Sequence, residues 1–249
     1  MKGSLDTLGW VKIPRSDDVL QWANHAKSVA DDILLLPDLR HWYRCEDTWF
    51  VGVDCLPNDE TGHLAGGPEY PETLKAHVPD IPLHAGQVSA IFPGYPKPVE
   101  GESEAAARYR IKRDAAHVDG LLPEGADRRR KLKEPHAYIL GIPLTSNPSN
   151  ASPLVVWEKS HLIMRDAFAK AFDGVAPEHW SEVDLTDAYH SARHRCFNEC
   201  DRVELPAEPG EALLIHRHCL HGMAPWNAGD GPPRIVAYFR PEGPWQDWI

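Results

Sequence analysis

Short β-rich runs recur along the chain, and most of them lie in its second half. Val, Ile, Leu and aromatic residues dominate these runs, and turn-forming residues separate one run from the next. The predicted strands span 48–54, 87–93, 136–143, 153–157, 201–205, 211–217 and 233–239. Because the strands do not alternate with helices, we predict a mainly β fold, a sandwich or barrel with a jelly roll as the leading choice.

Two helical regions accompany the strands. After Ser16, apolar residues recur at three- and four-residue steps over 17–36, which predicts an N-capped amphipathic helix packed against a sheet. The segment 162–200 also has a helical pattern and predicts an insertion within the strand series. Between the first helix and the later strands, the Pro-, Gly- and His-rich stretch 56–84 predicts an irregular loop.

The composition is that of one folded unit. Of the 249 residues, 42% are hydrophobic and 25% are charged, a balance typical of globular proteins. Neither an internal repeat nor a flexible Gly/Ser linker divides the sequence. We therefore predict a single domain that spans residues 1–249.

The acidic charge balance restricts the partners. A formal net charge of −11 repels nucleic-acid phosphates and anionic lipids, which favours a small-molecule substrate. No run reaches the roughly 18 apolar residues of a membrane span, and the first residues lack the apolar core of a signal peptide. Five cysteines without a regular framework predict a reducing, cytoplasmic location. The sequence does not predict the oligomeric state.

A metal site is first indicated by the run His117-Val-Asp119-Gly120. If this segment is extended, the side chains of His117 and Asp119 project from the same face, because strand periodicity is two. One imidazole and one carboxylate then converge, as in the facial triad of two His and one carboxylate that holds Fe(II) and leaves adjacent positions open for a co-substrate and O2. The third ligand must be a histidine.

His221 is the best placed of the downstream histidines. It follows the apolar strand Ala-Leu-Leu-Ile, and Gly222 and Pro225 end the strand so that the imidazole can point into a barrel mouth. His216 and His218 alternate with it along the chain, and we interpret both as structural or supporting residues.

Two further residues are candidates for binding 2-oxoglutarate. Arg234 opens the last predicted strand, and its planar guanidinium matches the distal carboxylate of 2-oxoglutarate in a bidentate pair. Tyr138 shares a strand face with His136, directly after the metal-binding run, and is a candidate for a hydrogen bond to 2-oxoglutarate. A packed core tyrosine is the alternative interpretation of Tyr138.

Three motifs carry a family resemblance: His117-x-Asp119, the stretch Pro153-Leu-Val-Val-Trp157-Glu-Lys-Ser160-His161, and Gly210-Glu-Ala-Leu-Leu-Ile followed by Leu220-His221-Gly222. From about Arg113 to its end, the chain resembles the phytanoyl-CoA dioxygenase-like branch of the Fe(II)/2-oxoglutarate-dependent dioxygenases. The second motif is similar to the family's P-L-x-V-x-P-G-S-H, with E-K replacing P-G. The interval between His221 and Arg234 is slightly longer than in the family, which makes Arg240 the reserve candidate for the 2-oxoglutarate arginine.

The resemblance implies an enzyme on a double-stranded β-helix of the cupin-like type, with flanking helices and a helical insertion. His117, Asp119 and His221 would hold Fe(II), and Arg234 would bind 2-oxoglutarate as the co-substrate. The enzyme would use O2 to hydroxylate or otherwise oxidise a small organic molecule, with release of succinate and CO2. Related halogenases replace the carboxylate ligand by a small residue, so Asp119 implies oxidation and not halogenation.

Two other functions remain open at this point: an isomerase-type metal-binding cupin-like protein, which would need a richer set of His and Glu ligands, and a non-catalytic binding protein on the same fold. The basic run Arg128–Lys133 is either a lid for an anionic substrate or a solvated loop or helix face. The sequence does not identify the substrate, which we expect to be selected by loops within 56–84, 120–134 and 162–200.

Overall fold

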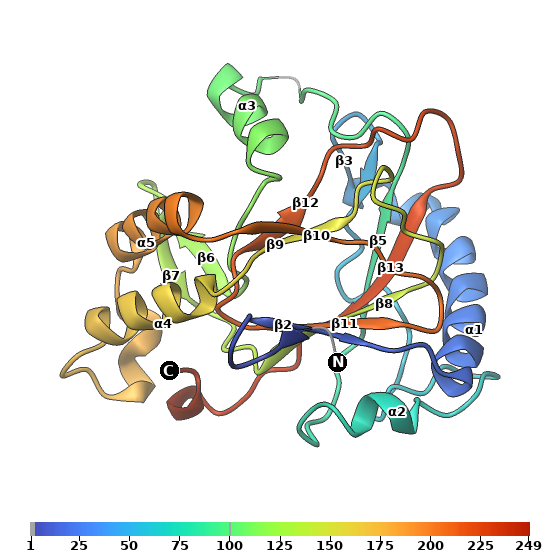
Figure 1. Cartoon of the computed structure of the whole chain (residues 1–249), viewed down its shortest axis with the longest axis horizontal. Coiled ribbons are helices and arrows are strands. Elements are labelled where there is room, and N and C mark those ends of the chain that lie inside the picture. The colour runs from blue at the N-terminus through green and yellow to red at the C-terminus, as the bar shows by residue number, and fades with distance from the viewer. Residues whose placement is uncertain (1–2, 100) are drawn as a thin grey trace.

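The computed structural model of the chain describes residues 3–99 and 101–249. Most strands belong to two antiparallel sheets, and two form a separate hairpin (Figure 1). The larger sheet has eight strands, in the spatial order β1 (Gly3–Ser4), β2 (Trp10–Ile13), β11 (Ala212–His216), β8 (Tyr138–Pro143), β13 (Arg234–Phe239), β5 (Gln87–Ile91), β4 (Trp49–Phe50) and β3 (Tyr43–Arg44). The smaller sheet has three strands, β10 (Arg202–Leu205), β9 (Leu154–Trp157) and β12 (His221–Met223).

The two sheets face each other across an apolar core. Ile139 and Ile215 project from the larger sheet into this core, and Leu154 and Val156 project into it from the smaller one. The next residue along each strand points to the opposite face, as the two-residue period of a strand requires. Two facing antiparallel sheets of this kind form a double-stranded β-helix, so the predicted fold class is confirmed.

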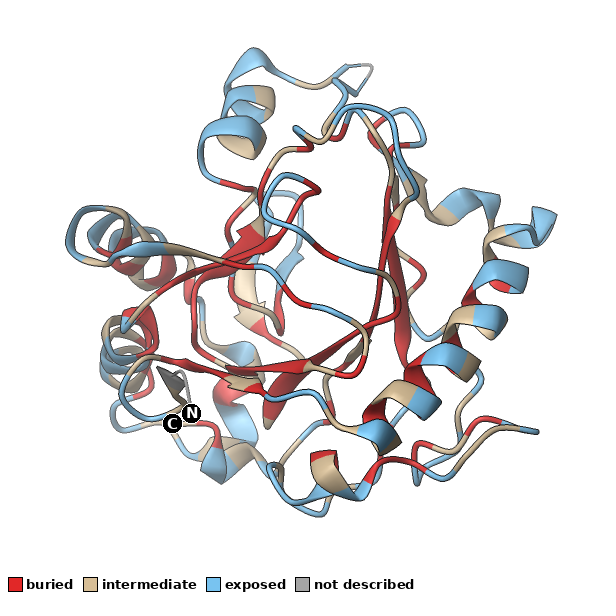
Figure 2. Cartoon of the chain, turned by 45° about the vertical axis from the view of Figure 1, so that its right-hand side comes forward, coloured by how far each residue is buried: buried red, intermediate tan, exposed pale blue. Residues whose placement is uncertain are grey.

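Helix α1 (Asp17–Leu34) covers the outer face of the larger sheet. Its inner face is buried through residues at three- and four-residue intervals, among them Val19, Trp22 and Ala26, and its outer face is exposed (Figure 2). The predicted amphipathic helix is therefore confirmed. Ser16 lies at the predicted capping position, but its hydroxyl donates to the carboxylate of Asp18 instead of capping a backbone N–H.

A second helical layer covers the outer face of the smaller sheet. Trp157 and Val155 of β9 pack there against the helical segment predicted as an insertion. The segment consists of α4 (Ser160–Ala171), the 3-10 helix η2 (Pro177–Glu182) and α5 (Thr186–Glu199). The molecule is thus layered as helix, large sheet, small sheet and helices, with each sheet buried on both faces.

Several elements differ from the sequence prediction. The predicted strand 48–54 is reduced to β4, and the stretch 56–84 is irregular except for α2. The remaining elements are η1 (Pro37–Trp42), α2 (Glu72–Lys75), α3 (Glu104–Lys112), η3 (Trp245–Asp247) and the hairpin of β6 (Leu121–Glu124) and β7 (Arg129–Leu132). The basic run Arg128–Lys133 is therefore mostly a hairpin strand and not a loop or helix face. Two of its cations, Lys131 and Lys133, pair with Glu124.

No helix in residues 3–99 and 101–249 is both long enough and apolar enough to cross a bilayer.

Candidate metal centre

A cavity opens between the two sheets at the point where β12 meets the segment after α3. The larger sheet contributes polar groups on β5 and the aromatic ring of Tyr238, and the smaller sheet contributes Leu154 and Met223. The lining residues are Trp49, Val51, Val53, Gln87, Ser89, His117, Asp119, Ile139, Leu154, His221, Gly222, Met223, Tyr238 and Arg240. All three metal-ligand candidates from the sequence therefore lie on one cavity.

Backbone pairing brings the two histidines together. The N–H of His117 donates to the carbonyl of His221 over 2.8 Å, and the N–H of His221 donates back over 3.0 Å. Residues that exchange both hydrogen bonds face each other directly, with side chains on the same side. Their imidazole ring centroids are accordingly 4.7 Å apart. The sequence argument assumed an extended segment at His117, and the structure shows a single antiparallel β-bridge at this residue.

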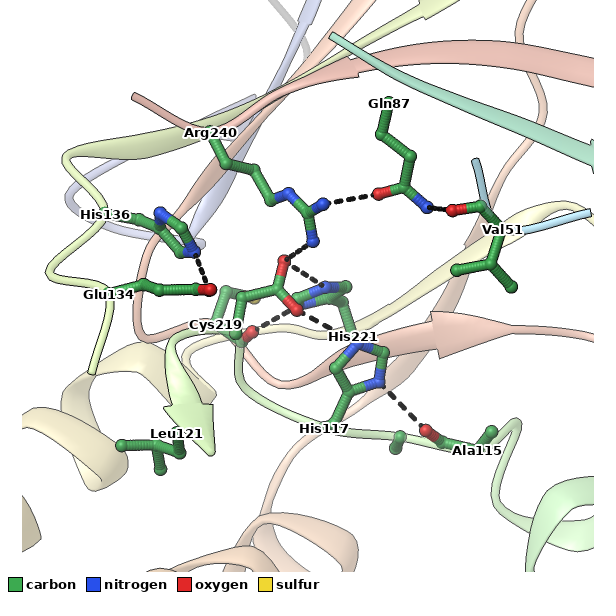
Figure 3. Close-up of polar contacts among 12 residues, drawn as sticks. Val51, Gln87, Ala115, His117, Leu121, Glu134, His136, Cys219, His221 and Arg240 are labelled. Carbon is green, nitrogen blue, oxygen red and sulfur yellow. Dashed lines mark hydrogen bonds and ion pairs between the residues drawn. The ribbon is translucent and has the colours of Figure 1, made fainter. Parts of the chain in front are cut away.

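Each imidazole is oriented by a backbone carbonyl two residues earlier. Nδ1 of His117 lies 3.0 Å from the carbonyl oxygen of Ala115, and Nδ1 of His221 lies 2.9 Å from that of Cys219 (Figure 3). A carbonyl can only accept, so each Nδ1 carries a proton, and Nε2 of each ring, which faces Asp119, is the nitrogen available to a metal. The carbonyl contact at Nδ1 is the usual support for a metal-binding imidazole.

The carboxylate of Asp119 lies between the two imidazoles. One oxygen is 3.1 Å from Nε2 of His117, and the other is 3.7 Å from Nε2 of His221. Burial alone would raise the pKa of Asp119, but the hydrogen bond from Nε2 of His117 and the charge of Arg240 hold it well below its usual value. Burial lowers the pKa of His221 to about 4. At neutral pH the site therefore offers an ionised carboxylate and an uncharged imidazole.

One ligand atom from each of these three residues lies within 4.8 Å of the others. No other group of three His, Cys, Asp or Glu side chains in residues 3–99 and 101–249 brings its ligand atoms this close. Two imidazole nitrogens and one carboxylate oxygen suit a first-row divalent metal such as iron, and three ligands on one side leave positions open. The donor set therefore fits Fe(II).

An ion pair between the exposed Arg202 and the buried carboxylate of Asp114 fixes the segment that leads into the site. Asp114 and Ala115 both have positive φ, at 53° and 51°, a region that L-residues rarely adopt. The guanidinium of Arg202 on β10 donates to both carboxylate oxygens of Asp114, at 2.7 and 2.8 Å. The carbonyl of Asp114 also accepts from the N–H of Met223, and Gly222 permits the close approach because a Cβ there would lie 2.1 Å from the same oxygen. The ion pair and this backbone bond hold the turn against β12.

Replacing Arg202 with Met is expected to reduce the free energy of unfolding by about 2 kcal/mol, because it leaves the carboxylate of Asp114 buried without a partner. Thermal denaturation of the apoprotein measures the loss. Arg195→Met is the matched control, since Arg195 makes a similar two-bond pair with Glu199, but on the surface of α5. It should change stability by less than about 0.5 kcal/mol. Equal losses in the two variants would contradict the role of the ion pair at Asp114.

Arg234 is a buried cation without a counter-ion. Its exposed fraction is 2%, and no carboxylate of the described residues forms an ion pair with it. One terminal nitrogen donates to the hydroxyl of Tyr238 over 3.0 Å, the other contacts the sulfur of Met223, and Nε has no partner. Since Tyr238 and Met223 line the cavity, the guanidinium lies directly behind its wall. A buried, unpaired guanidinium is costly unless an anion joins it.

Arg240, the reserve candidate, is already paired. One terminal nitrogen lies 3.3 Å from the carboxylate oxygen of Asp119 that faces His221. The other donates to the side-chain oxygen of Gln87 over 2.5 Å (Figure 3). The amide nitrogen of Gln87 in turn donates to the carbonyl of Val51. This chain of contacts ties the metal-ligand carboxylate to β5, so Arg240 supports Asp119 from within the cavity.

Tyr138 lies away from the metal-ligand cluster. Its side chain points to the face of β8 that packs toward α1, and it lines a separate cavity with Tyr70 and Leu83. Ile139, the next residue, faces the metal-ligand cavity instead. The structure therefore does not bring Tyr138 to the other candidates, because the parity of β8 is opposite to the one assumed from the sequence. Tyr238, which sequence reasoning missed, is the tyrosine at this cavity.

Solved structures with the same architecture include three that align along nearly the whole chain. The non-haem α-ketoglutarate-dependent carbocyclase SnoK from nogalamycin biosynthesis is 16% identical over 94% of this chain and 79% of its own, with a TM-score of 0.50. The epimerase SnoN, in complex with Fe3+, α-ketoglutarate and nogalamycin RO, is 15% identical over 97% of this chain and 84% of its own, with a TM-score of 0.52. EvdMO1 is 16% identical over 95% of this chain and 48% of its own, with a TM-score of 0.51.

At these identities the similarity shows the fold alone. No protein-family model matches the sequence, and no curated protein matches it significantly.

Proposed function

We propose that this chain is an Fe(II)- and 2-oxoglutarate-dependent oxygenase of the phytanoyl-CoA dioxygenase-like type, which hydroxylates or otherwise oxidises a small organic molecule. The observation that carries the proposal is the convergence of His117, Asp119 and His221 on a cavity between the sheets. Solved proteins with this fold include one in complex with iron and α-ketoglutarate, which is the same compound as 2-oxoglutarate.

The buried guanidinium of Arg234 supports 2-oxoglutarate as the co-substrate. A dianion that binds the metal at one end needs a cation for its distal carboxylate, and Arg234 lacks a counter-ion in the described part of the chain. Its planar fork can form two parallel hydrogen bonds to that carboxylate, and the hydroxyl of Tyr238 is at hand to add a third. Arg240 is a weaker candidate because Asp119 already compensates its charge.

The residues of the site have distinct tasks in this reaction. When bound, Fe(II) and 2-oxoglutarate supply the oxidation of a substrate C–H bond by O2, with succinate and CO2 as the other products. His117, Asp119 and His221 would hold the metal, and the backbone carbonyls behind both imidazoles keep a proton on Nδ1 and direct Nε2 toward the metal position. The apolar side of the cavity, which includes Leu154 and Ile139, keeps water away from the reacting carbon.

The test is anaerobic reconstitution with Fe(II) and 2-oxoglutarate, followed by exposure to O2 and measurement of succinate. We expect slow, substrate-free conversion of 2-oxoglutarate that requires Fe(II), together with measurable binding of 2-oxoglutarate to the metal-loaded protein. A tightly coupled enzyme can lack this background turnover, so the binding measurement decides in that case. A protein that binds neither Fe(II) nor 2-oxoglutarate would overturn the proposal.

Replacing Arg240 with Met is expected to weaken Fe(II) binding by about tenfold, because groups that orient a metal ligand typically contribute factors of 10 to 100. The variant removes the contact to the carboxylate oxygen of Asp119 that faces His221. Metal titration in the absence of 2-oxoglutarate measures this effect separately from co-substrate binding. Arg240→Lys should restore part of the affinity. Unchanged metal affinity in Arg240→Met would show that Asp119 needs no such support.

A further inference from the structure

A second cavity adjoins the metal centre. It shares Val53 and Arg240 with the metal-ligand cavity and extends from them along the opposite side of the Arg240 side chain. Unlike the metal-ligand cavity, it is lined mainly by charged and polar side chains. The lining residues are Val53, Asp54, Ile81, Pro82, His84, Glu134, His136, Arg240, Pro241 and Glu242.

The fold holds the backbone of Glu134 against the residue that follows Asp119. Gly120 follows Asp119 directly, and its φ of +80° together with its missing side chain lets the backbone of Glu134 pack against it. A Cβ on Gly120 would lie 2.2 Å from the carbonyl oxygen of Glu134. The carbonyl of Gly120 accepts from the N–H groups of Lys133 and Glu134. These backbone contacts join the segment that lines the second cavity to the segment that carries Asp119.

A second carboxylate, that of Glu242, lines the same cavity as Glu134. His136 and Glu242 form a β-bridge, which places their side chains next to each other. His136 lies 3.2 Å from the carboxylate of Glu134 through Nε2, and its Nδ1 has no hydrogen-bond partner in the described residues although the residue is 94% buried. A polar group of this kind, on the wall of a cavity, is a group that a ligand can satisfy.

The charges in this cavity favour a cation. Three carboxylates line it, those of Asp54, Glu134 and Glu242. The hydrogen bond from His136 lowers the pKa of Glu134, and burial lowers the pKa of His84, so the carboxylate is ionised and the imidazole of His84 is uncharged at neutral pH. The cation on the wall, Arg240, is occupied by Asp119 and Gln87. An anionic group would have to displace one of these partners, whereas a cation can join the carboxylate of Glu242, which has no ion pair among the described residues, and that of Glu134 beside His136.

We propose that the second cavity is the part of the substrate site that binds a protonated amine of the substrate, with Glu134 and Glu242 as its main partners. This inference rests on the proposed function, because the metal-ligand cavity is then the place where the substrate is oxidised. The amine would hold the substrate on one side of Arg240 while the carbon to be oxidised lies on the metal side. The negative field of the acidic chain would attract such a substrate.

The test compares three probes of one shape and different charge: cyclohexylamine, cyclohexanol and cyclohexanecarboxylate. Saturation-transfer NMR on Zn(II)-loaded protein measures their affinities, and relaxation enhancement on Mn(II)-loaded protein shows whether a bound probe lies near the metal. We expect the amine to bind about tenfold more tightly than the alcohol, since it gains charge-assisted hydrogen bonds. We expect the carboxylate to bind most weakly, and Mn(II) to relax the bound amine.

The variants decide whether the carboxylates are responsible. The double variant Glu134→Gln/Glu242→Gln should lose the preference for the amine, and Glu242→Gln alone, on an exposed residue, should lose part of it. Glu178→Gln, on the exposed side of η2, is the matched control and should keep the preference. Equal affinity for amine and alcohol in the unaltered protein, tighter binding of the carboxylate, or an amine preference retained in the double variant would overturn the inference.

The same samples keep this inference separate from the proposed function. Metal binding is read independently from the EPR signal of free Mn(II), and 2-oxoglutarate binding from calorimetry. A protein that binds metal and 2-oxoglutarate but shows no amine preference would disprove the second cavity as an amine site and leave the oxygenase intact. A protein that binds the amine but no metal would disprove the oxygenase.

Discussion

Replacing His117 with Ala is expected to weaken Fe(II) binding more than a hundredfold and to abolish 2-oxoglutarate turnover. Supporting groups around a metal ligand already contribute factors of roughly 10 to 100, and the loss of a ligand itself must exceed them. His117 is the most informative of the three ligands to replace because its side chain is 48% exposed. Its removal opens no cavity in the core, so the free energy of unfolding of the apoprotein should change little.

The matched control is His179→Ala, which removes another exposed histidine, on η2 and outside the metal-ligand cavity. It should leave metal affinity, turnover and stability unchanged. Fe(II) affinity is measured by anaerobic titration, and the melting temperature of the apoprotein is measured in parallel. If His117→Ala retained Fe(II) affinity within a factor of a few, the metal centre would have to lie elsewhere.

The convergence of His117, Asp119 and His221 could be predicted from the sequence because each position depends on a local rule. Two-residue periodicity places His117 and Asp119 on one side even in an irregular segment, since Val118 between them points into the core beneath the helical layer. The setting of His221 after an apolar strand identified it among 14 histidines. What the sequence could not give is the backbone pairing of His117 with His221, which joins segments about a hundred positions apart.

Two of the elements that were missed, α3 and β7, lack an apolar pattern, whereas the missed strand β2 is apolar but short. Helix α3 has no buried residue, and β7 reads Arg-Arg-Lys-Leu, so neither shows the periodicity by which elements are recognised. Only the tertiary contacts of β7 with β6 reveal it as a strand. Tyr138 shows the opposite failure. Its strand was predicted correctly, but the face of a strand buried on both sides cannot be read from apolar residues alone, because every position of β8 is buried.

The polar groups that support Asp119 also could not be predicted from the sequence. Gln87 is one of two polar residues in β5, with Ser89, and only the structure shows that its amide joins Val51 to Arg240 and hence to Asp119. A polar residue within an otherwise buried strand is itself a signal, because an unpaired buried amide is costly. Such a signal predicts that a partner exists without identifying it.

Arg234→Met is expected to raise the dissociation constant of 2-oxoglutarate at least about thirtyfold, because loss of one partner from a buried, hydrogen-bonded charge pair costs about 2–5 kcal/mol. The stability of the apoprotein, in contrast, should not decrease. Without 2-oxoglutarate, the guanidinium is buried and lacks a counter-ion among the described residues. Its replacement by an apolar chain of similar length should therefore leave the free energy of unfolding unchanged or raise it.

Weaker 2-oxoglutarate binding without loss of apoprotein stability distinguishes a co-substrate arginine from a structural one. A structural arginine would destabilise the apoprotein when replaced, and its loss would affect 2-oxoglutarate only through that instability. Calorimetry on Mn(II)-loaded protein measures the dissociation constant, and thermal denaturation with and without 2-oxoglutarate measures the stabilisation that the ligand confers. Arg240→Met serves as the comparison, because it should weaken metal binding more than 2-oxoglutarate binding. If Arg240→Met instead lost 2-oxoglutarate while Arg234→Met kept it, Arg240 would be the co-substrate arginine, and the unpaired charge of Arg234 would need another anion.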